Sequence, residues 1–245
     1  MMKIKNLQIE SSKNIRFQVW KSLLKSSGIK EHQLFILSGE KLILEAKHKN
    51  QIKIQSEIRT SSMPTLNWAP ESITLSAELF KELDIIGTHF PLIVVEMPCV
   101  QTLAHHQKTE GIEVVLPVGD PSNLGALIRS CVAFGVSKII LTQEAAHPFL
   151  TKSIKASAGA VLSAPLYFTG DLNEWDSSEA YALDLEGQDI RELKRTTNLR
   201  LIVGEEGPGL KNLKNLKKLK IPTQNVESLN VTVATSIALW ELNRF

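Results

Sequence analysis

The chain has 245 residues, 43% of them hydrophobic, with 28 Lys or Arg against 26 Asp or Glu and two cysteines. That apolar fraction is enough for a packed core and excludes wholesale disorder. Two cysteines without metal-ligand spacing exclude a disulfide framework, and no apolar run approaches the roughly 18 residues needed to cross a bilayer. We therefore expect a protein of the cytoplasm with neither a membrane nor a metal as its partner.

Positive charge is concentrated near the amino terminus. Residues 1–60 hold 12 Lys or Arg against 5 Asp or Glu, whereas the remainder holds 16 against 21. This division suits an amino-terminal part that binds a polyanion beside a catalytic body, and it suits a lysine-rich, solvated surface equally well.

The first hundred residues predict a small α/β domain. Ile15, Val19 and Leu23 predict the apolar face of one helix over residues 13–28, which ends at Gly28. Beyond it, short apolar runs alternate with helical periods, as in an α/β sandwich. The expected strands are 35–37, 52–54 and 91–96, and the expected helices are 40–46 and 76–83.

From residue 111 onward, strands and helices alternate at the spacing of a parallel sheet covered on both faces. No Gly-x-Gly-x-x-Gly follows the first strand, which excludes the dinucleotide-binding fingerprint. The expected strands lie near 113–118, 137–142, 163–168, 180–185, 199–204 and 218–222, and the expected helices near 123–134, 151–160, 210–215 and 228–243.

Residues 120–135 leave the first of these strands, turn sharply and become an amphipathic helix. Ser122 or Asn123 is a candidate cap for this helix. Arg129 falls near its apolar stripe, where a guanidinium needs an anionic partner. Because Asn123 follows the carboxyl end of a strand, where open α/β sheets bind ligands, we expect a functional site here. The stripe itself consists of Leu124, Leu127, Ile128 and Cys131.

Two segments near the carboxyl end join a buried or short strand to a turn or loop. Residues 201–210 are a buried strand that enters a glycine-rich, acidic turn, and residues 221–241 are a short strand, a loop and a terminal helix. Glycines permit close backbone approach to a ligand, but for either segment alone a helix or strand stop with glycines for turn geometry is the simpler interpretation. The residues that stand out are Gly204, Glu206, Gly207, Gly209, Ile221, Ser228, Leu229 and Asn230.

Together and in this order, the three segments resemble the signature of the SpoU/TrmH family of RNA ribose methyltransferases, within the SPOUT superfamily. The resemblance implies a catalytic domain over residues 112–245, with a parallel sheet and a deep trefoil knot. It also implies S-adenosyl-L-methionine as the cofactor, with Ile221 and Leu229 flanking the adenine. It further implies a homodimer, in which Phe134, Leu239 and Trp240 are candidates for apolar contacts, although core packing explains these residues equally well.

The amino-terminal part has a looser resemblance of its own. A basic helix, the segment 34–43 and a closing strand before a linker are similar to the substrate-binding domain that precedes many SpoU catalytic domains. That domain is similar in fold to small ribosomal proteins that bind kinked RNA. The resemblance implies an RNA-binding domain over residues 1–105, and it favours ribosomal RNA over transfer RNA, with no role for DNA.

The same resemblance implies a role for individual residues. A guanidinium stays protonated, so we expect Arg129 to hold a phosphate and orient the ribose hydroxyl rather than act as the base. Helix capping is an alternative role for Asn123 and for Ser228. The implied catalytic residues are Asn123, Arg129, Glu206, Ser228 and Asn230, and the implied cofactor-binding residues are Gly204, Gly209, Ile221, Leu229 and Asn230.

The leading hypothesis is therefore an S-adenosylmethionine-dependent methyltransferase that acts on a ribose 2′-hydroxyl of ribosomal RNA. A transfer-RNA ribose methyltransferase is the alternative within the same chemistry. A protein that binds RNA on the same fold without catalysis is the alternative outside it.

Overall fold

A computed structural model of the chain describes residues 4–50, 52–104, 107–170, 180–194, 196–204 and 216–244. Its contacts divide the chain into two compact units, Met1–Pro98 with His147–Ser163, and Cys99–Ala146 with Ala164–Phe245. The segment 147–163, which the sequence places inside the second expected domain, is thus grouped with the first unit. The expected domain ranges 1–105 and 112–245 stay a prediction.

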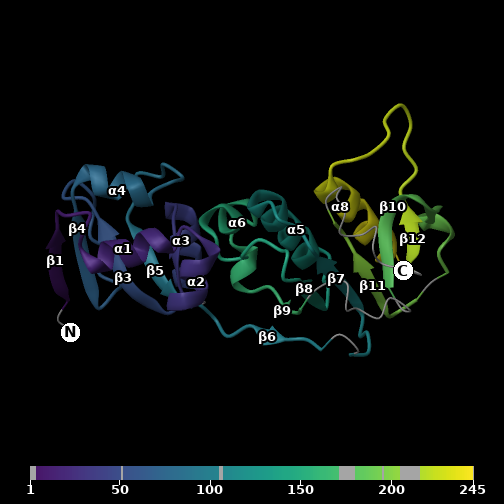
Figure 1. Cartoon of the computed structure of the whole chain (residues 1–245), viewed down its shortest axis with the longest axis horizontal. Coiled ribbons are helices and arrows are strands. Elements are labelled where there is room, and N and C mark those ends of the chain that lie inside the picture. Colours follow the sequence, from purple (N-terminus) through teal and green to yellow (C-terminus); the bar gives the residue numbers. More distant parts are fainter. Residues whose placement is uncertain are drawn as a thin grey trace. The chain divides into compact units, whose positions relative to one another are not determined.

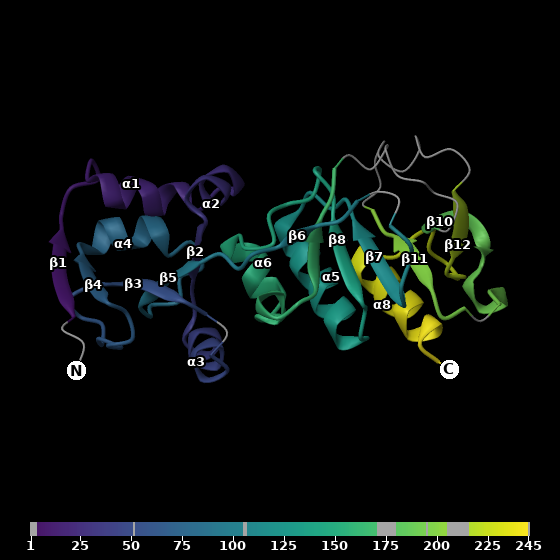
Figure 2. The same cartoon turned by 90° about the horizontal axis from the view of Figure 1, so that it is seen from below.

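The first unit contains a five-stranded mixed sheet in the order β1-β4-β3-β5-β2. Its core joins the buried sheet face to α1 and α4, which lie on the same face (Figure 2). Strands β1 and β4 were not expected from the sequence. The strands are β1 (Lys5–Ile9), β2 (Leu34–Leu37), β3 (Ile54–Arg59), β4 (Glu71–Leu75) and β5 (Leu92–Glu96). The helices are α1 (Ile15–Ser22), α2 (Ser26–His32), α3 (Glu40–His48), α4 (Ala77–Leu83), α6 (Thr151–Ala156) and the 3₁₀ turn η1 (Ala160–Leu162).

The single helix expected over residues 13–28 is wrong, because the chain breaks it into α1 and α2. Gly28 lies inside α2 and does not end a helix. A Cβ at this position would collide with the backbone carbonyl of Ser22, so the glycine lets the two helices approach closely.

The expected apolar face of this region is confirmed at Leu23, which is buried, but not at Ile15. Phe17 and Trp20 are buried, whereas Ile15 is 82% exposed. Both faces have an acceptable helical period, and burying two aromatic rings removes more apolar area from water than burying Ile15 would.

The second unit contains a seven-stranded parallel sheet in the order β12-β10-β11-β7-β8-β9-β6, drawn in Figure 1. All six strands expected after residue 111 are present, so the α/β class with a parallel sheet is confirmed; β6 was assigned to the linker. The strands are β6 (Gln101–Thr102), β7 (Ile112–Leu116), β8 (Lys138–Leu141), β9 (Leu166–Phe168), β10 (Ala180–Asp189), β11 (Leu199–Ile202) and β12 (Lys217–Lys220). The helices are α5 (Pro121–Ala133), α8 (Val231–Leu242) and the 3₁₀ turn η3 (Ile190–Glu192).

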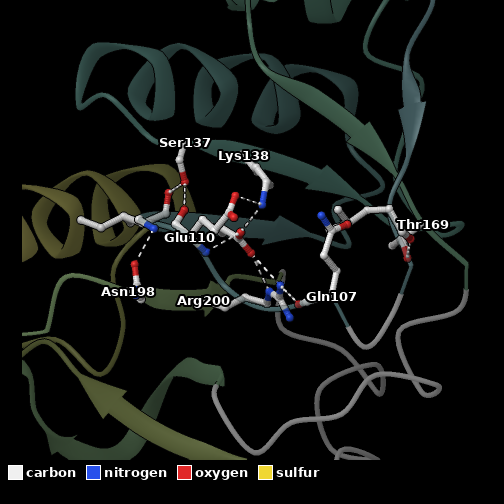
Figure 3. A network of polar contacts seen from close by, with 11 residues as sticks. Gln107, Glu110, Ser137, Lys138, Thr169, Asn198 and Arg200 are labelled. Carbon is white, nitrogen blue, oxygen red and sulfur yellow. Dashed lines mark hydrogen bonds and ion pairs between the residues drawn. The ribbon is translucent and has the colours of Figure 1, made fainter.

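A row of buried charges crosses the centre of this sheet. Glu113 of β7 pairs in register with Arg200 of β11 on one side and with Lys138 of β8 on the other. Its carboxylate lies 2.7 Å from the Arg200 guanidinium and 2.9 Å from the Lys138 ammonium (Figure 3). Burial lowers the pKa of Lys138, but hydrogen bonds from its ammonium to Glu113 and Glu110 outweigh burial and leave that pKa above its ordinary value. A shift of one residue in the pairing of any of these strands would leave the charges unpaired, so the row of charges specifies the register of the sheet.

Within the described residues, no helix is both long enough and apolar enough to cross a membrane.

Candidate active site

The three segments singled out in the sequence leave neighbouring parts of one sheet edge. Strands β7 and β11 are adjacent, β12 follows beyond β10, and all of them run parallel. The carboxyl ends of parallel strands lie at the same edge. Asn123, Gly204 and Ile221, which follow β7, β11 and β12, therefore emerge on the same side of the sheet, as expected for a ligand site.

The turn into α5 is shaped by Asp120. Its carboxylate accepts hydrogen bonds from the backbone N–H groups of Ser122 and Asn123, at 2.9 and 2.8 Å. Pro121 occupies the first helical position, where its missing N–H costs nothing. The expectation that Ser122 or Asn123 caps the helix is thus wrong, because Asp120 is the cap.

Arg129 lies on the solvent side of α5. The apolar stripe is confirmed, since Leu124, Leu127, Ile128 and Cys131 are all fully buried, but Arg129 is exposed and lies outside it. Within the described part of the chain, no hydrogen bond or ion pair holds its guanidinium. Arg129 therefore needs no buried anion, and its charged end is open to a ligand in solution.

Cys131 on the same helix is excluded as a nucleophile. Its thiol is fully buried, and burial raises its pKa to about 12. The thiolate that would react is therefore not formed near neutral pH. The sequence-based interpretation of Cys131 as a small core residue is confirmed.

The terminal helix α8 begins at Asn230. The Asn230 side-chain oxygen accepts a hydrogen bond of 2.9 Å from the N–H of Thr232, which makes Asn230 the cap. Ser228 lies two residues earlier and is exposed, so a capping role for Ser228 is wrong. Leu229, between them, is half-buried, as is Ile221 after β12.

Helices α5 and α8 lie side by side, as Figures 1 and 2 both show. The hydroxyls of Ser130 and Ser236 are 2.8 Å apart, and the rings of Phe134 and Trp240 meet edge to face with their centroids 6.4 Å apart. This packing brings the helix of Arg129 against the helix that Asn230 caps, although about a hundred residues of sequence separate them.

The glycine-rich segment 201–210 lies within the described residues only up to Gly204. The N–H of Val203 donates to the carbonyl of Val115 at 3.0 Å, which extends the pairing of β11 with β7, and Gly204 follows half-buried. Glu206, Gly207 and Gly209, the helix expected near 210–215 and the knot that would involve this stretch lie on or depend on residues outside the described part. Their roles stay predictions.

Two threonines that the sequence analysis did not single out carry buried hydroxyls at this edge. Thr142 follows β8 and is 3% exposed, and Thr232 lies in the first turn of α8. Within the described residues neither hydroxyl has a hydrogen-bond partner. Buried polar groups are normally satisfied. Buried hydroxyls without a partner among the described residues are candidates for hydrogen bonds to a polar ligand such as a nucleoside. A threonine directly after a buried strand was the available signal for Thr142.

Comparison with known proteins identifies the family. Residues 112–240 match the SpoU rRNA Methylase family. The "Ribosomal RNA small subunit methyltransferase G 2" of Syntrophobacter fumaroxidans is 34% identical over 97% of this chain and 49% of its own length, so the chain spans about half of that relative. The "23S rRNA (guanosine(2553)-2'-O)-methyltransferase RlmP" of Bacillus subtilis is 28% identical over 96% of this chain and 98% of its own length.

Solved structures share the fold over nearly the whole chain. An AdoMet-bound rRNA methyltransferase from Sinorhizobium meliloti has a TM-score of 0.76 at 23% identity, over 98% of both chains. The SpoU methyltransferase AviRb from Streptomyces viridochromogenes, in complex with AdoMet, has a TM-score of 0.77 at 23% identity, over 95% of this chain and 98% of its own. Since the family match covers more than half of the sequence and includes all three segments at the carboxyl edge, the chain belongs to the SpoU rRNA Methylase family of RNA methyltransferases.

Proposed function

We propose that the chain transfers a methyl group from S-adenosylmethionine to a ribose 2′-hydroxyl of ribosomal RNA in the cytoplasm. The single observation that carries the proposal is the packing of α5 against α8 at the carboxyl edge of the parallel sheet. This packing brings the helix of an exposed arginine against a capped helix whose first turn carries the buried hydroxyl of Thr232, which has no partner among the described residues. The AdoMet bound to two solved structures of the same fold supports the choice of cofactor.

The reaction requires alignment more than covalent chemistry. The cofactor supplies a methyl group on a sulfonium; the ribose oxygen forms the new bond to carbon as the bond from carbon to sulfur breaks, and the hydroxyl proton leaves. Holding the oxygen, carbon and sulfur in line is the larger part of the task. In the proposed arrangement, Ile221 and Leu229 flank the adenine, while Gly204 and Gly209 let the main chain approach the nucleoside.

Arg129 is proposed to position the RNA. Its exposed guanidinium, without a partner among the described residues, suits a bidentate grip on the phosphate beside the reacting ribose. Because a guanidinium stays protonated, the proton goes to that phosphate or to a carboxylate. Asn123, Glu206, Ser228 and Asn230 are proposed to hold Arg129 and the reacting nucleotide.

The first unit is proposed to bind the RNA. Eight of its lysines are exposed and form no ion pair within the described residues, so their charge remains available to phosphates. These lysines are Lys13, Lys25, Lys30, Lys47, Lys49, Lys81, Lys152 and Lys155. RlmP, which aligns over both units, is named for a 23S ribosomal RNA nucleotide, and this favours ribosomal over transfer RNA.

A homodimer is proposed from the surface of α8. Val233, Ile237 and Trp240 are 48, 39 and 63% exposed and recur at helical spacing, which leaves an apolar stripe facing outward. A hollow of about 420 Å³ beside it is lined by residues of α5 and α8 that include Phe134 and Trp240. A second copy of the chain is the proposed occupant of this face.

Isotopic methyl transfer tests the proposed activity. Radiolabelled S-adenosylmethionine is incubated with the full chain and ribosomal RNA from cells that lack the protein, and the RNA is digested to nucleosides. Label is expected in one 2′-O-methylnucleoside. Label on a base excludes ribose chemistry, and label only in a parallel reaction with transfer RNA replaces the substrate class. No label together with no calorimetric binding of the cofactor favours a binding protein without catalysis.

A further inference from the structure

A groove lies at the edge of the second sheet opposite the candidate active site. Its lining includes residues that precede or begin four adjacent strands, namely Thr109 before β7, Asn198 before β11, Tyr181 in β10 and Lys217 in β12, together with Gln188 near the end of β10. Its volume is about 570 Å³. Pockets of a few hundred cubic ångströms hold a ligand the size of a nucleotide.

The lining of the groove is positively charged. Lys108, Lys194 and Lys217 come from three separate segments, and Glu192 is the one carboxylate among the lining residues. Within the described ranges none of the three ammonium groups has a carboxylate partner. Three unneutralised positive charges around one hollow favour an anionic ligand with several charges.

The groove also contains an aromatic ring. The Lys217 ammonium lies 5.4 Å from the centre of the Tyr181 ring, and that ring is half-buried. Rings beside ammonium groups are the combination with which proteins hold single-stranded nucleic acid, because bases stack on the rings and phosphates contact the charges. The ligand chemistry indicated is therefore that of a nucleoside phosphate.

The segment that carries Lys108 and Thr109 is held in place by polar contacts, several of which are drawn in Figure 3. Arg200 donates to the carbonyl of Gln107 at 2.9 Å, and the N–H of Glu110 donates to Glu113 at 3.0 Å. The N–H of Gly111 donates to the side-chain oxygen of Asn198 at 2.8 Å. The segment that carries Lys108 is thus fixed from both ends before any ligand arrives, which reduces the entropic cost of binding.

We propose that this groove binds the phosphodiester backbone of a single-stranded stretch of RNA, as a contact separate from the candidate active site. The inference rests on the proposed function, because it takes the RNA substrate as the occupant. In this arrangement the second unit binds RNA at the carboxyl edge of its sheet and at the opposite edge.

Matched lysine variants of the full chain test the groove. The Lys108→Gln, Lys194→Gln, Lys217→Gln triple variant removes the three groove charges. Lys218→Gln is the control, because neighbouring strand residues point to opposite faces and Lys218 is paired with Asp184 at 2.9 Å. The probe is a short fluorescent single-stranded RNA of mixed sequence, whose anisotropy is measured between about 50 and 200 mM KCl. Circular dichroism confirms that each variant is folded, and calorimetry measures its affinity for S-adenosylmethionine.

The triple variant is expected to bind the probe about 10-fold more weakly at low salt, with a salt slope smaller by about 2, since each single-strand phosphate contact contributes about 0.7. Cofactor affinity and the Lys218→Gln control stay at the wild-type values. Unchanged probe affinity and slope in the triple variant overturn the inference, and if the wild type still methylates RNA the proposed function survives. If the triple variant shows the expected loss of affinity and salt slope but the wild type transfers no methyl group, the groove is supported and the proposed activity is excluded. Saturable binding of free GMP that the triple variant loses, with RNA binding unchanged, assigns the groove to a free nucleotide and overturns the inference.

Discussion

Glu113 and Arg200 stand opposite each other on β7 and β11, their charged groups 2.7 Å apart and both side chains at most 5% exposed. With Lys138 on the other side of Glu113, the carboxylate contacts two cations inside the sheet, and Glu110 is a second partner of Lys138. Such a carboxylate contributes to stability mainly because its removal would leave buried cations without a counter-charge.

Replacing Glu113 by Gln is therefore expected to lower the free energy of unfolding of the second unit by about 3–5 kcal/mol. Urea unfolding of the full chain measures the change. Glu186→Gln is the control, because that side chain is 85% exposed and its change is expected to stay within about 0.5 kcal/mol. A loss in Glu113→Gln no larger than that of the control contradicts the prediction.

His147 predicts a dependence of the first unit's stability on pH. Burial, followed by the charge of Lys30, lowers the pKa of His147 from 6.5 to about 4. The unfolded chain then binds the proton more readily, so the stabilising effect is complete above pH 6.5 and is lost as the pH falls to 4. The loss is of the order of 3 kcal/mol across that window.

The measurement is the unfolding free energy of wild type and His147→Gln at several pH values. Subtracting the two profiles removes the contribution of the carboxyl groups to the pH dependence. These include Glu57, the pKa of which is raised by burial. Wild-type stability is expected to fall more steeply below pH 6.5 than that of the variant, whereas exposed His48→Gln should follow wild type. Parallel profiles for wild type and His147→Gln would rule out this role for His147.

Arg129→Ala is expected to lower kcat for methyl transfer by about 10²–10³-fold, because the guanidinium is proposed to stabilise charge beside the reacting oxygen. Arg129→Lys keeps the charge and loses the bidentate geometry, so it should recover only part of the rate. Single-turnover transfer to ribosomal RNA measures both variants, and calorimetry should find unchanged cofactor affinity. Full turnover in Arg129→Ala removes the residue from its proposed role.

Asn230 allows the capping role to be separated from a role in the site. Asn230→Ala should cost about 1 kcal/mol of stability through the lost cap. Asn230→Asp keeps an oxygen that accepts from the N–H of Thr232 and adds a favourable charge at the helix start, so it should be as stable as wild type. If Asn230 contacts the reacting nucleotide, the stable Asp variant still loses methyl transfer; wild-type transfer in Asn230→Asp would leave capping as its function.

The exposed stripe of α8 predicts the oligomeric state. Ile237→Glu and Trp240→Glu place a charge on this face and should shift the chain from dimer to monomer in analytical ultracentrifugation. Ile15→Glu, at a position 82% exposed in the first unit, is the control. A monomeric wild type, or variants that sediment as dimers, would argue against α8 as the interface.

The sequence was sufficient to predict the elements of the catalytic body. Strands buried on both faces read as continuous apolar runs, so β7, β8 and β11 were found within a few residues. Strands β1 and β4 were missed because polar and apolar residues are mixed in them, and their partners are distant in sequence. The helix cap at Asp120 was missed because several residues in a row have capping side chains, and only the backbone path decides which one meets the N–H groups.

By itself, then, the sequence determined the class of fold, the order of the six strands after residue 111 and the family, since periodicity and motifs are local properties. The tertiary structure decided which distant residues meet. The pairing of Glu113 with Arg200 and the packing of Ser130 on Ser236 depend on strand order and helix contacts that no local pattern contains. The groove at the opposite edge of the sheet could not be predicted from the sequence for the same reason. Its lysines are scattered over more than a hundred residues and line one hollow only after the sheet has formed.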